Sequence, residues 1–227
     1  MTVVGILGAG RMGRTLARLL VDAGHEVRLA NSRGPASLRD LVAELGPRAG
    51  AVEASAIARG ADVVILATRW EQLEGAVAAV PSWDGVVVVD TTNPRFGPGP
   101  DDVYDVGART SSEVVAALMP GARVVKAFNH QPIPALATEL RPRPSERNAL
   151  FLAGDDAEAK QIVAELVRSI GGAPIDTGGL RDGGALQASG GGPLAGHGRL
   201  LTVAEARTIL ARAGALSGSG RRASRRR

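Results

Sequence analysis

A glycine-rich turn near the start of the chain carries the first residues that could do chemistry. The turn follows an apolar run and precedes a stretch with helical periodicity. In this setting the first glycine permits a tight turn, the second lets the backbone approach a pyrophosphate, and the third lets helix and strand pack closely. The start of the helix presents free N–H groups to the anion. We therefore predict a dinucleotide site that includes Gly8, Gly10, Arg11, Met12 and Gly13.

About twenty residues downstream, the second apolar run ends in Asn31, Ser32 and Arg33 rather than in an acid. NAD sites place Asp or Glu there to bind the adenosine ribose, whereas an arginine suits the 2′-phosphate of NADP. A carboxylate would repel that phosphate, while Arg33 can pair with it and Ser32 and Asn31 can donate hydrogen bonds to it. These three residues predict that the cofactor is NADP(H), with NADPH as its reduced form, rather than NAD. The alternative is that Arg33 is a solvated turn residue.

Polar residues also follow three later apolar runs. Thr68 and Arg69 follow the fourth, Asn93 the fifth, and Asn129 and His130 the sixth. Ligands of open α/β sheets bind outside the carboxyl ends of the strands, so we predict that the first four of these residues contact the cofactor. Asn93 is the candidate for a nicotinamide or ribose contact, or else it starts a turn before proline. His130 is the candidate proton donor, or else it is structural.

The elements that must position these residues alternate between strands and helices. Runs rich in β-branched residues indicate strands at 2–7, 26–32, 51–53, 61–68, 85–92 and 122–129. Apolar residues at helical spacing indicate helices at 11–23, 37–45, 71–80 and 111–119. Strands that alternate with short helices indicate βαβ units. We therefore predict an α/β fold, a Rossmann-type doubly wound parallel sheet with helices on both faces.

The regular alternation of predicted strands and helices changes after residue 129. Helices are predicted at 130–140, 155–172 and 203–214, with strands at 149–154 and 173–176. From Gly178 to Gly198, nine of 21 residues are glycine, which predicts no regular structure. We assign residues 1–148 to an NADP-binding domain and 149–214 to a small C-terminal α/β lobe that contributes to the substrate cleft. Residues 215–227 are predicted to form a disordered basic tail.

Composition narrows the function classes. The formal net charge of +4 depends on the tail, because the last seven residues hold five arginines and the rest of the chain has 22 basic against 23 acidic residues. Aromatic residues make up only 3% of the chain, which leaves few platforms for stacking bases, so we predict no nucleic-acid partner. No apolar run is long enough to span a bilayer and no signal peptide is evident. The sequence predicts a cytoplasmic protein without membrane contact.

Other chemistries lack their motifs. The chain has no cysteine and no His-Glu-x-x-His pattern, so we predict no metal site. It also lacks the Gly-x-Ser-x-Gly turn of hydrolases and the phosphate-binding loop of ATP-using enzymes. Lys126, one of two lysines, lies within a predicted strand. We predict that it forms an ion pair rather than a Schiff base.

Several stretches together resemble one family, the coenzyme F420-dependent NADP oxidoreductases and related dinucleotide-binding enzymes. They are "GILGAGRMG", "NSRGP", "VVDTTNP", "RVVKAFNH", "GDDAEAK" with "IDTGGL", and "GGALQ", in family order over roughly residues 1–190. The resemblance implies a Rossmann domain with a small C-terminal lobe, an NADP(H) site at residues 8–13 and 31–33, and a homodimer. In characterised members a hydride passes between NADPH and the deazaflavin C5 of F420, a reaction that needs alignment more than an acid or base.

The identity of the hydride acceptor stays open at this point. One alternative is an NADPH-dependent reductase of a small imine or carbonyl compound, and another is a non-catalytic NADPH-binding protein. F420 carries a phosphate and a polyglutamate tail, so Arg141, Arg143 and Arg147 form a hypothetical contact for it. A solvated loop is the other interpretation of these arginines.

Overall fold

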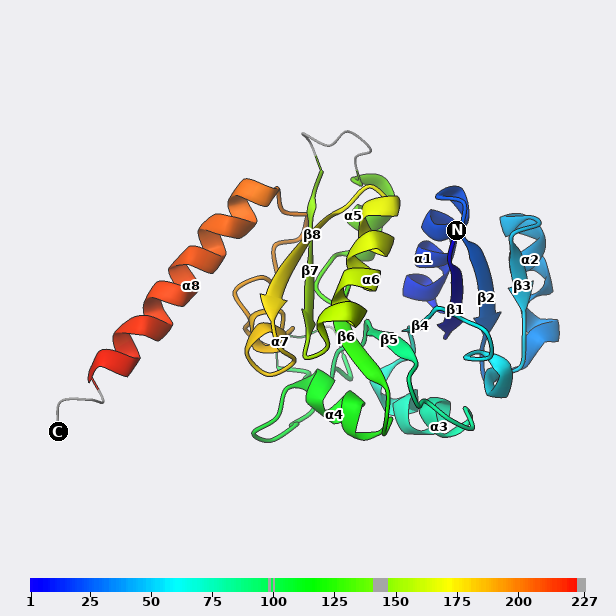
Figure 1. Ribbon diagram of the computed structural model, residues 1–227, viewed down its shortest axis with the longest axis horizontal. Coiled ribbons are helices and arrows are strands. Elements are labelled where there is room, and N and C mark those ends of the chain that lie inside the picture. The colour runs from blue at the N-terminus through cyan, green and yellow to red at the C-terminus, as the bar shows by residue number, and fades with distance from the viewer. Residues whose placement is uncertain (98, 100, 141–146, 224–227) are drawn as a thin grey trace.

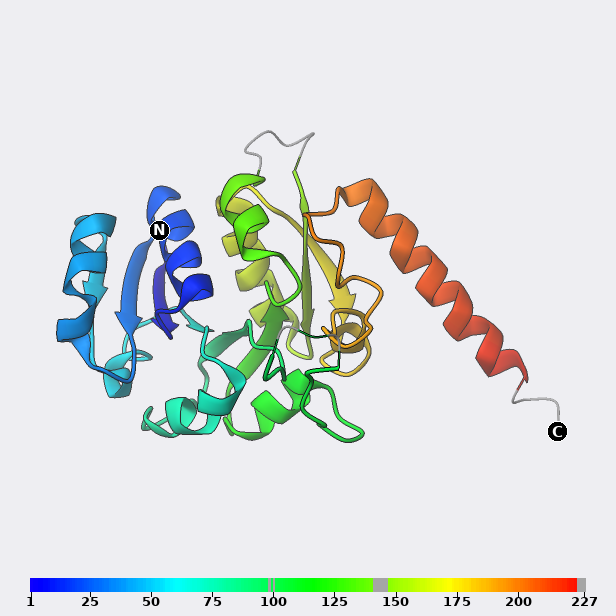
Figure 2. The same ribbon diagram turned by 180° about the vertical axis from the view of Figure 1, so that it is seen from behind.

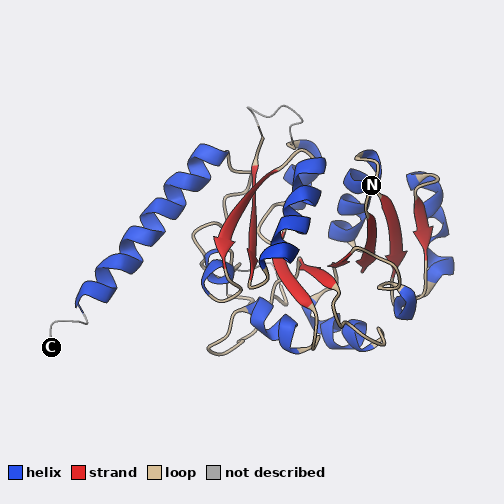
Figure 3. Cartoon of the chain, in the orientation of Figure 1, coloured by secondary structure: helices blue, strands red, loops and turns tan. Residues whose placement is uncertain are grey.

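The computed structural model describes residues 1–97, 99, 101–140 and 147–223. Its centre is one eight-stranded sheet with the strand order β3-β2-β1-β4-β5-β6-β7-β8 (Figure 3). Neighbouring strands run parallel, except that β7 is antiparallel to β6. The strands are β1 (Val3–Leu7), β2 (Glu26–Ala30), β3 (Ala49–Ala51), β4 (Val63–Leu66), β5 (Val87–Asp90), β6 (Arg123–Ala127), β7 (Ala149–Gly154) and β8 (Ala173–Gly178).

Helices connect the strands and cover both faces of the sheet (Figures 1 and 2). This confirms the predicted α/β, doubly wound class. The α-helices are α1 (Arg11–Asp22), α2 (Arg39–Leu45), α3 (Leu73–Ala78), α4 (Ser111–Ala117), α5 (Ile133–Thr138), α6 (Ala157–Ser169), α7 (Asp182–Leu186) and α8 (Val203–Ala223). Short 3₁₀ turns, η1 (Pro35–Leu38), η2 (Ala54–Ala56) and η3 (Trp70–Gln72), lie in the connections.

Two apolar layers hold the helices against the sheet. Successive residues of a strand point to opposite faces, so Ile65 packs in one layer and Leu66 in the other. The first layer receives Leu16 of α1 and Val163 of α6, and the second receives Val77 of α3. Because both faces are covered, the central strands carry continuous apolar runs rather than alternating apolar and polar residues.

Strand register brings four strand ends together at one edge. Leu7 of β1 pairs with Leu66 of β4, Leu66 with Asp90 of β5, and Asp90 with Lys126 of β6. Neighbouring strands lie about 4.8 Å apart, so the loops after these strands form one continuous edge. β1 lies between β2 and β4, which is the point where the chain changes direction across the sheet. Open α/β sheets bind ligands at such a switch point.

The C-terminal segment extends the same sheet. The predicted domain boundary at residue 148 falls just before β7, but three residue pairs join β7 to β6. Phe151 of β7 packs with Leu194, Leu201 and Ala206 in a third apolar cluster. The segment therefore has its own small core while it shares a sheet with residues 1–148.

The glycine-rich stretch contains regular structure, contrary to the sequence prediction. Helix α7 lies within it and includes Gly183 and Gly184, both buried. A Cβ on Gly183 would lie 2.7 Å from the carbonyl carbon of Thr177, and one on Gly184 would lie 3.6 Å from the Thr110 hydroxyl. Gly183 therefore allows close packing of α7 on β8, while the contact at Gly184 is of ordinary van der Waals length.

The final helix α8 projects away from the sheet in both ribbon views (Figures 1 and 2). It continues to Ala223, whereas the sequence predicted a disordered tail from residue 215. Each residue added to an existing helix gains a hydrogen bond without a new nucleation cost, so the helix extends through the serines and glycines at 217–220 despite their low helix propensity. Residues 224–227 lie outside the described part. Among the described helices, none combines the length and apolar character that crossing a bilayer requires.

Candidate functional site

The glycine turn has the backbone geometry that its sequence predicts. Gly8 directly follows β1 and adopts a φ of 113°, and a Cβ there would lie 2.5 Å from the carbonyl oxygen of Ala67. A side chain on Gly13 would collide with the carbonyl oxygen of Gly8. Gly10, in contrast, has no heavy atom within 4 Å of where its Cβ would be. The turn is crowded on its protein side and open at Gly10.

Helix α1 begins directly after Gly10, and no side chain caps its first turn. Its first N–H groups are therefore available to an external acceptor. Arg11 is exposed, whereas Met12 packs against the apolar core. Arg14 Nε donates to the carbonyl oxygen of Ala9 at 3.0 Å, which holds the turn against the helix.

The end of β2 forms a compact polar turn. Asn31 Oδ1 accepts a hydrogen bond from the backbone N–H of Arg33 at 2.9 Å, and Asn31 Nδ2 donates to Ser37 Oγ at 3.0 Å. Ser32 and Arg33 are exposed. Among the described residues, the structure records no ion pair for the Arg33 guanidinium. Asn31 thus fixes the backbone of the turn, and the Ser32 hydroxyl and the Arg33 guanidinium stay exposed to solvent.

A cavity of about 650 Å³ unites these segments. This volume is typical of small-molecule and cofactor sites. Thr68 contributes a hydroxyl that is buried and has no hydrogen-bond partner among the described residues. The cavity is lined by the loop after β1, the turn after β2, the loop after β4 and one face of α3: Leu7, Gly8, Ala9, Gly10, Asn31, Ser32, Arg33, Ala54, Ala67, Thr68, Arg69, Gln72, Gly75, Ala76 and Ala79.

Sequence reasoning missed the α3 side of this cavity. Gly75, Ala76 and Ala79 present small side chains there, beside Gln72. Small residues at positions i and i+4 of a predicted helix next to a glycine-rich turn were the available signal, since they leave a flat, open helix face. Of the predicted cofactor residues, Arg11, Met12, Gly13, Asn93 and Asn129 do not line the cavity.

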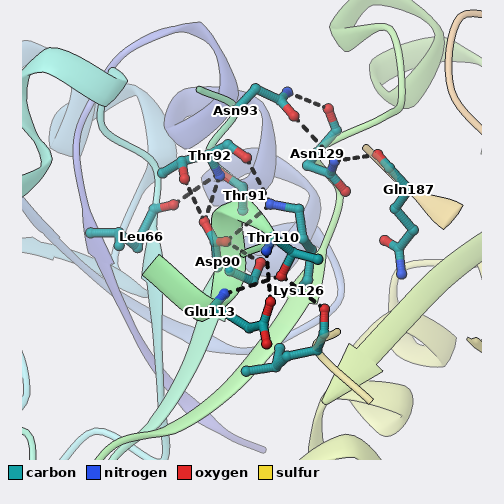
Figure 4. A network of polar contacts seen from close by, with 12 residues as sticks. Leu66, Asp90, Thr91, Thr92, Asn93, Thr110, Glu113, Lys126, Asn129 and Gln187 are labelled. Atoms are coloured by element: carbon teal, nitrogen blue, oxygen red, sulfur yellow. Dashed lines mark hydrogen bonds and ion pairs between the residues drawn. The ribbon is translucent and has the colours of Figure 1, made fainter. Parts of the chain in front are cut away.

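Beyond β4, the strand ends carry a buried polar network (Figure 4). Lys126 Nζ lies 3.0 Å from Asp90 Oδ2, and both side chains are almost fully buried, with exposed fractions of 1% and 0%. Ser112 Oγ also donates to Asp90 Oδ2, at 2.6 Å. The predicted ion pair of Lys126 is thus confirmed. Burial alone would raise the pKa of Asp90, but the Lys126 ammonium and the hydrogen bonds from Ser112 and Thr92 outweigh it and lower that pKa.

Asn93 and Asn129 bind each other across the ends of β5 and β6 (Figure 4). Asn93 Nδ2 donates to the carbonyl oxygen of Asn129 at 2.7 Å, and Asn129 Nδ2 donates to Asn93 Oδ1 at 3.2 Å. Asn129 Nδ2 also lies 2.9 Å from the carbonyl oxygen of Gln187, just after α7. Both amides are engaged within the protein, so their placement joins the sheet edge to the glycine-rich segment.

His130 is partly buried beside this pair. Its ring packs against Phe151 with 4.6 Å between ring centroids, and its two nitrogens contact the Asn129 and Gln131 side chains. Burial, together with the charges of Lys126 and His197, lowers the pKa of His130 to about 3. The imidazole is therefore neutral near pH 7 and its nitrogens are occupied. This environment favours the structural role over that of proton donor.

Two further predictions from the sequence concern the arginine-rich loop and metal binding. Arg141 and Arg143 lie outside the described residues, so their contact with an acceptor stays a prediction. Within the described residues, no group of three or more His, Asp or Glu side chains is arranged to hold a metal ion.

Comparison with known proteins gives the family. Residues 3–94 match the model of the NADP oxidoreductases, coenzyme F420-dependent. A hypothetical protein from Sinorhizobium meliloti is 40% identical, with a TM-score of 0.80 over 89% of this chain and 96% of that one. A proposed F420-dependent NADP-reductase from Arthrobacter sp. FB24 is 30% identical, with a TM-score of 0.68 over 79% and 86% of the two chains.

A longer protein shares the same region. The rat metalloreductase STEAP3 is 33% identical over 177 residues, which are 78% of this chain and 34% of that protein. The chain therefore spans about a third of the length of this curated relative. With the glycine turn, the Rossmann-type sheet and the Arthrobacter likeness in agreement, the chain belongs to the family of coenzyme F420-dependent NADP oxidoreductases.

Proposed function

We propose that the protein transfers a hydride between NADPH and coenzyme F420 or a similar acceptor. The observation that carries this proposal is the cavity that joins Gly8 and Gly10 to Asn31, Ser32 and Arg33. Gly10 and the free start of α1 suit a pyrophosphate. Arg33, with no ion pair recorded among the described residues, suits the 2′-phosphate of NADPH.

The direction of the bound cofactor follows from these two anion positions. The 2′-phosphate at the end of β2 and the pyrophosphate at the start of α1 place the adenosine half over β2 and β1. The nicotinamide half then extends past Thr68 toward the ends of β5 and β6. In this pose Thr68 and Arg69 border the cofactor, and Asn93 and Asn129 shape the nicotinamide end.

The chemistry supports a deazaflavin acceptor over an imine or carbonyl compound. A hydride leaves C4 of NADPH with its electron pair and bonds to C5 of the deazaflavin, while a proton from water completes the reduced acceptor. Such a transfer depends on stacking and alignment. Reduction of a carbonyl oxygen would instead call for a nearby proton donor, and His130 is partly buried and neutral.

The direct test mixes the protein, NADPH and oxidised F420 and follows the loss of deazaflavin absorbance. We expect loss at a rate proportional to protein concentration, with NADPH preferred over NADH. No loss beyond the protein-free control would contradict F420 as acceptor. A panel of imines and carbonyl compounds then tests the alternative substrate class, and NADPH binding without turnover on any acceptor would indicate a non-catalytic protein.

We also propose a homodimer, which the resemblance implies, and a location in the cytoplasm, which the composition favours. Analytical ultracentrifugation of the full chain tests the first, with twice the chain mass of 23.3 kDa expected at micromolar concentration. A monomer at that concentration would contradict it.

A further inference from the structure

The Asp90–Lys126 ion pair occupies an unusual place for two charges. The residues of β5 and β6 between Arg123 and this pair are apolar, including the fully buried Val88, Val89 and Val125. The pair lies at the carboxyl end of the two strands, next to the loops that border the proposed nicotinamide position. Fully buried lysine and aspartate are rare unless paired. Apolar residues of similar volume often stabilise a core as well as a buried ion pair does, so stability alone does not account for this one.

The two charges hold Thr92 at three atoms. Asp90 Oδ1 accepts from the Thr92 backbone N–H at 2.8 Å and from its hydroxyl at 2.7 Å. Lys126 Nζ donates to the Thr92 carbonyl oxygen at 2.9 Å. Both polar groups of the Thr92 backbone are therefore fixed by side chains from β5 and β6. A loop residue held in this way has one conformation rather than several.

The fixed residue leads directly into the clamp between the two asparagines. Asn93 follows Thr92 and exchanges hydrogen bonds with Asn129. The residue before Asn129, Phe128, is buried and has a φ of 62°, the only positive φ recorded for a non-glycine residue in the described part of the chain. Such a backbone is strained and persists where the surrounding structure enforces it, commonly at functional sites.

We propose that Lys126 and Asp90 are positioning residues for the nicotinamide half of the cofactor. They fix Thr92 and, through it, the clamp of Asn93 with Asn129 that borders the ring. This inference depends on the proposed use of NADPH. It predicts that the pair governs how the nicotinamide is held, while the adenosine half binds independently of it.

Two probes separate the halves of the cofactor. NADPH carries both, and 2′-phospho-ADP-ribose lacks the nicotinamide. The variant is the double substitution Asp90→Asn with Lys126→Met, which removes both charges together and keeps an acceptor for the Thr92 N–H. We expect its Kd for 2′-phospho-ADP-ribose to stay within about twofold of the parent, while NADPH binds roughly 10-fold more weakly, the equivalent of about one lost hydrogen bond. The fluorescence of bound reduced nicotinamide should move toward that of free NADPH.

A matched control lies on the same strand. Arg123, at the other end of β6, pairs with Asp156 at 2.8 Å, far from the proposed site. Arg123→Met removes a cation from β6 and should leave both Kd values and the nicotinamide fluorescence unchanged. Thr92→Val, which deletes only the hydroxyl bond to Asp90, is a milder second variant and should shift the fluorescence in the same direction.

The outcomes are distinguishable. Unchanged NADPH affinity and fluorescence in the folded double variant would overturn the positioning role, and so would equal weakening of both probes, which indicates a general structural role. If the parent protein binds neither probe, the proposed use of NADPH fails first, and the positioning role fails with it.

Discussion

The two halves of the sheet edge are built in opposite ways. Around Gly8, Gly10 and Arg33 the site is made of local segments that leave groups unsatisfied, ready for an external anion. Around Asp90 and Lys126 it is made of side chains 36 residues apart that satisfy each other completely. The first half offers hydrogen bonds to a ligand, whereas the second offers a fixed shape. Perturbing each half should therefore give different signatures.

Breaking the buried half should cost the most stability. Lys126→Met leaves the Asp90 carboxylate buried without its cation, and such a loss typically destabilises by about 3–5 kcal/mol. Urea denaturation measures it. The double variant Asp90→Asn with Lys126→Met should recover most of the loss, because no unpaired charge remains. A single variant within about 1 kcal/mol of the parent would show that the pair is not energetically coupled.

Breaking the open half should change cofactor choice instead. Arg33→Asp removes a charge-assisted contact worth roughly 1.5–3 kcal/mol, which corresponds to a shift of roughly 10- to 150-fold toward NADH over NADPH. The ratio of the two Kd values measures it. Arg39→Asp, an equal change of charge at an exposed position outside the cavity, is the control. An unchanged ratio in Arg33→Asp would contradict the assignment of the 2′-phosphate.

Within the glycine turn, two glycines should separate folding from binding. Gly8→Ala puts a side chain at a φ of 113° against the Ala67 carbonyl and should destabilise by about 1–3 kcal/mol. The Cβ of a valine at position 10 would meet no protein atom within 4 Å, so Gly10→Val should leave the free energy of unfolding within about 0.5 kcal/mol while it abolishes NADPH binding. Thermal melts with and without NADPH compare them. Tight NADPH binding by Gly10→Val would place the pyrophosphate elsewhere.

A pH dependence of stability is expected from His130. Its pKa is about 3 in the folded protein and near 6.5 when unfolded, so the unfolded state binds more protons between these values. The neutral imidazole contributes fully to the free energy of unfolding above pH 6.5, and this contribution is lost as the pH falls toward 3. The slope is no steeper than about 1.4 kcal/mol per pH unit. Urea midpoints from pH 7 to 4.5 should fall less steeply in His130→Gln. Identical slopes would show that the imidazole is not protected.

The sequence could predict the open half of the sheet edge but not the buried half. The glycine turn and Asn31, Ser32 and Arg33 are contiguous, and the physics that they use is backbone room and outward charge, both visible in a short segment. The α/β class was equally accessible because apolar periodicity reports burial. The clamp of Asn93 with Asn129 was not, since it arises only when β5 and β6 are placed side by side.

The prediction for the glycine-rich stretch was wrong for a related reason. Its glycines resemble a loop because nothing in the local sequence shows that α7 packs against Thr177 at Gly183. His130 shows the same limit, because its burial depends on Phe151 from β7, twenty-one residues later in the chain. Packing partners distant in sequence decide both cases.

The antiparallel pairing of β6 with β7 has a mechanical consequence. Three residue pairs, at Val125, Lys126 and Ala127, join the C-terminal segment to the strand that carries the buried lysine. Two domains joined only by a flexible hinge can rotate apart, whereas two segments of one sheet cannot do so without breaking strand pairing. We therefore expect the C-terminal segment to move with the sheet rather than as a separate lobe.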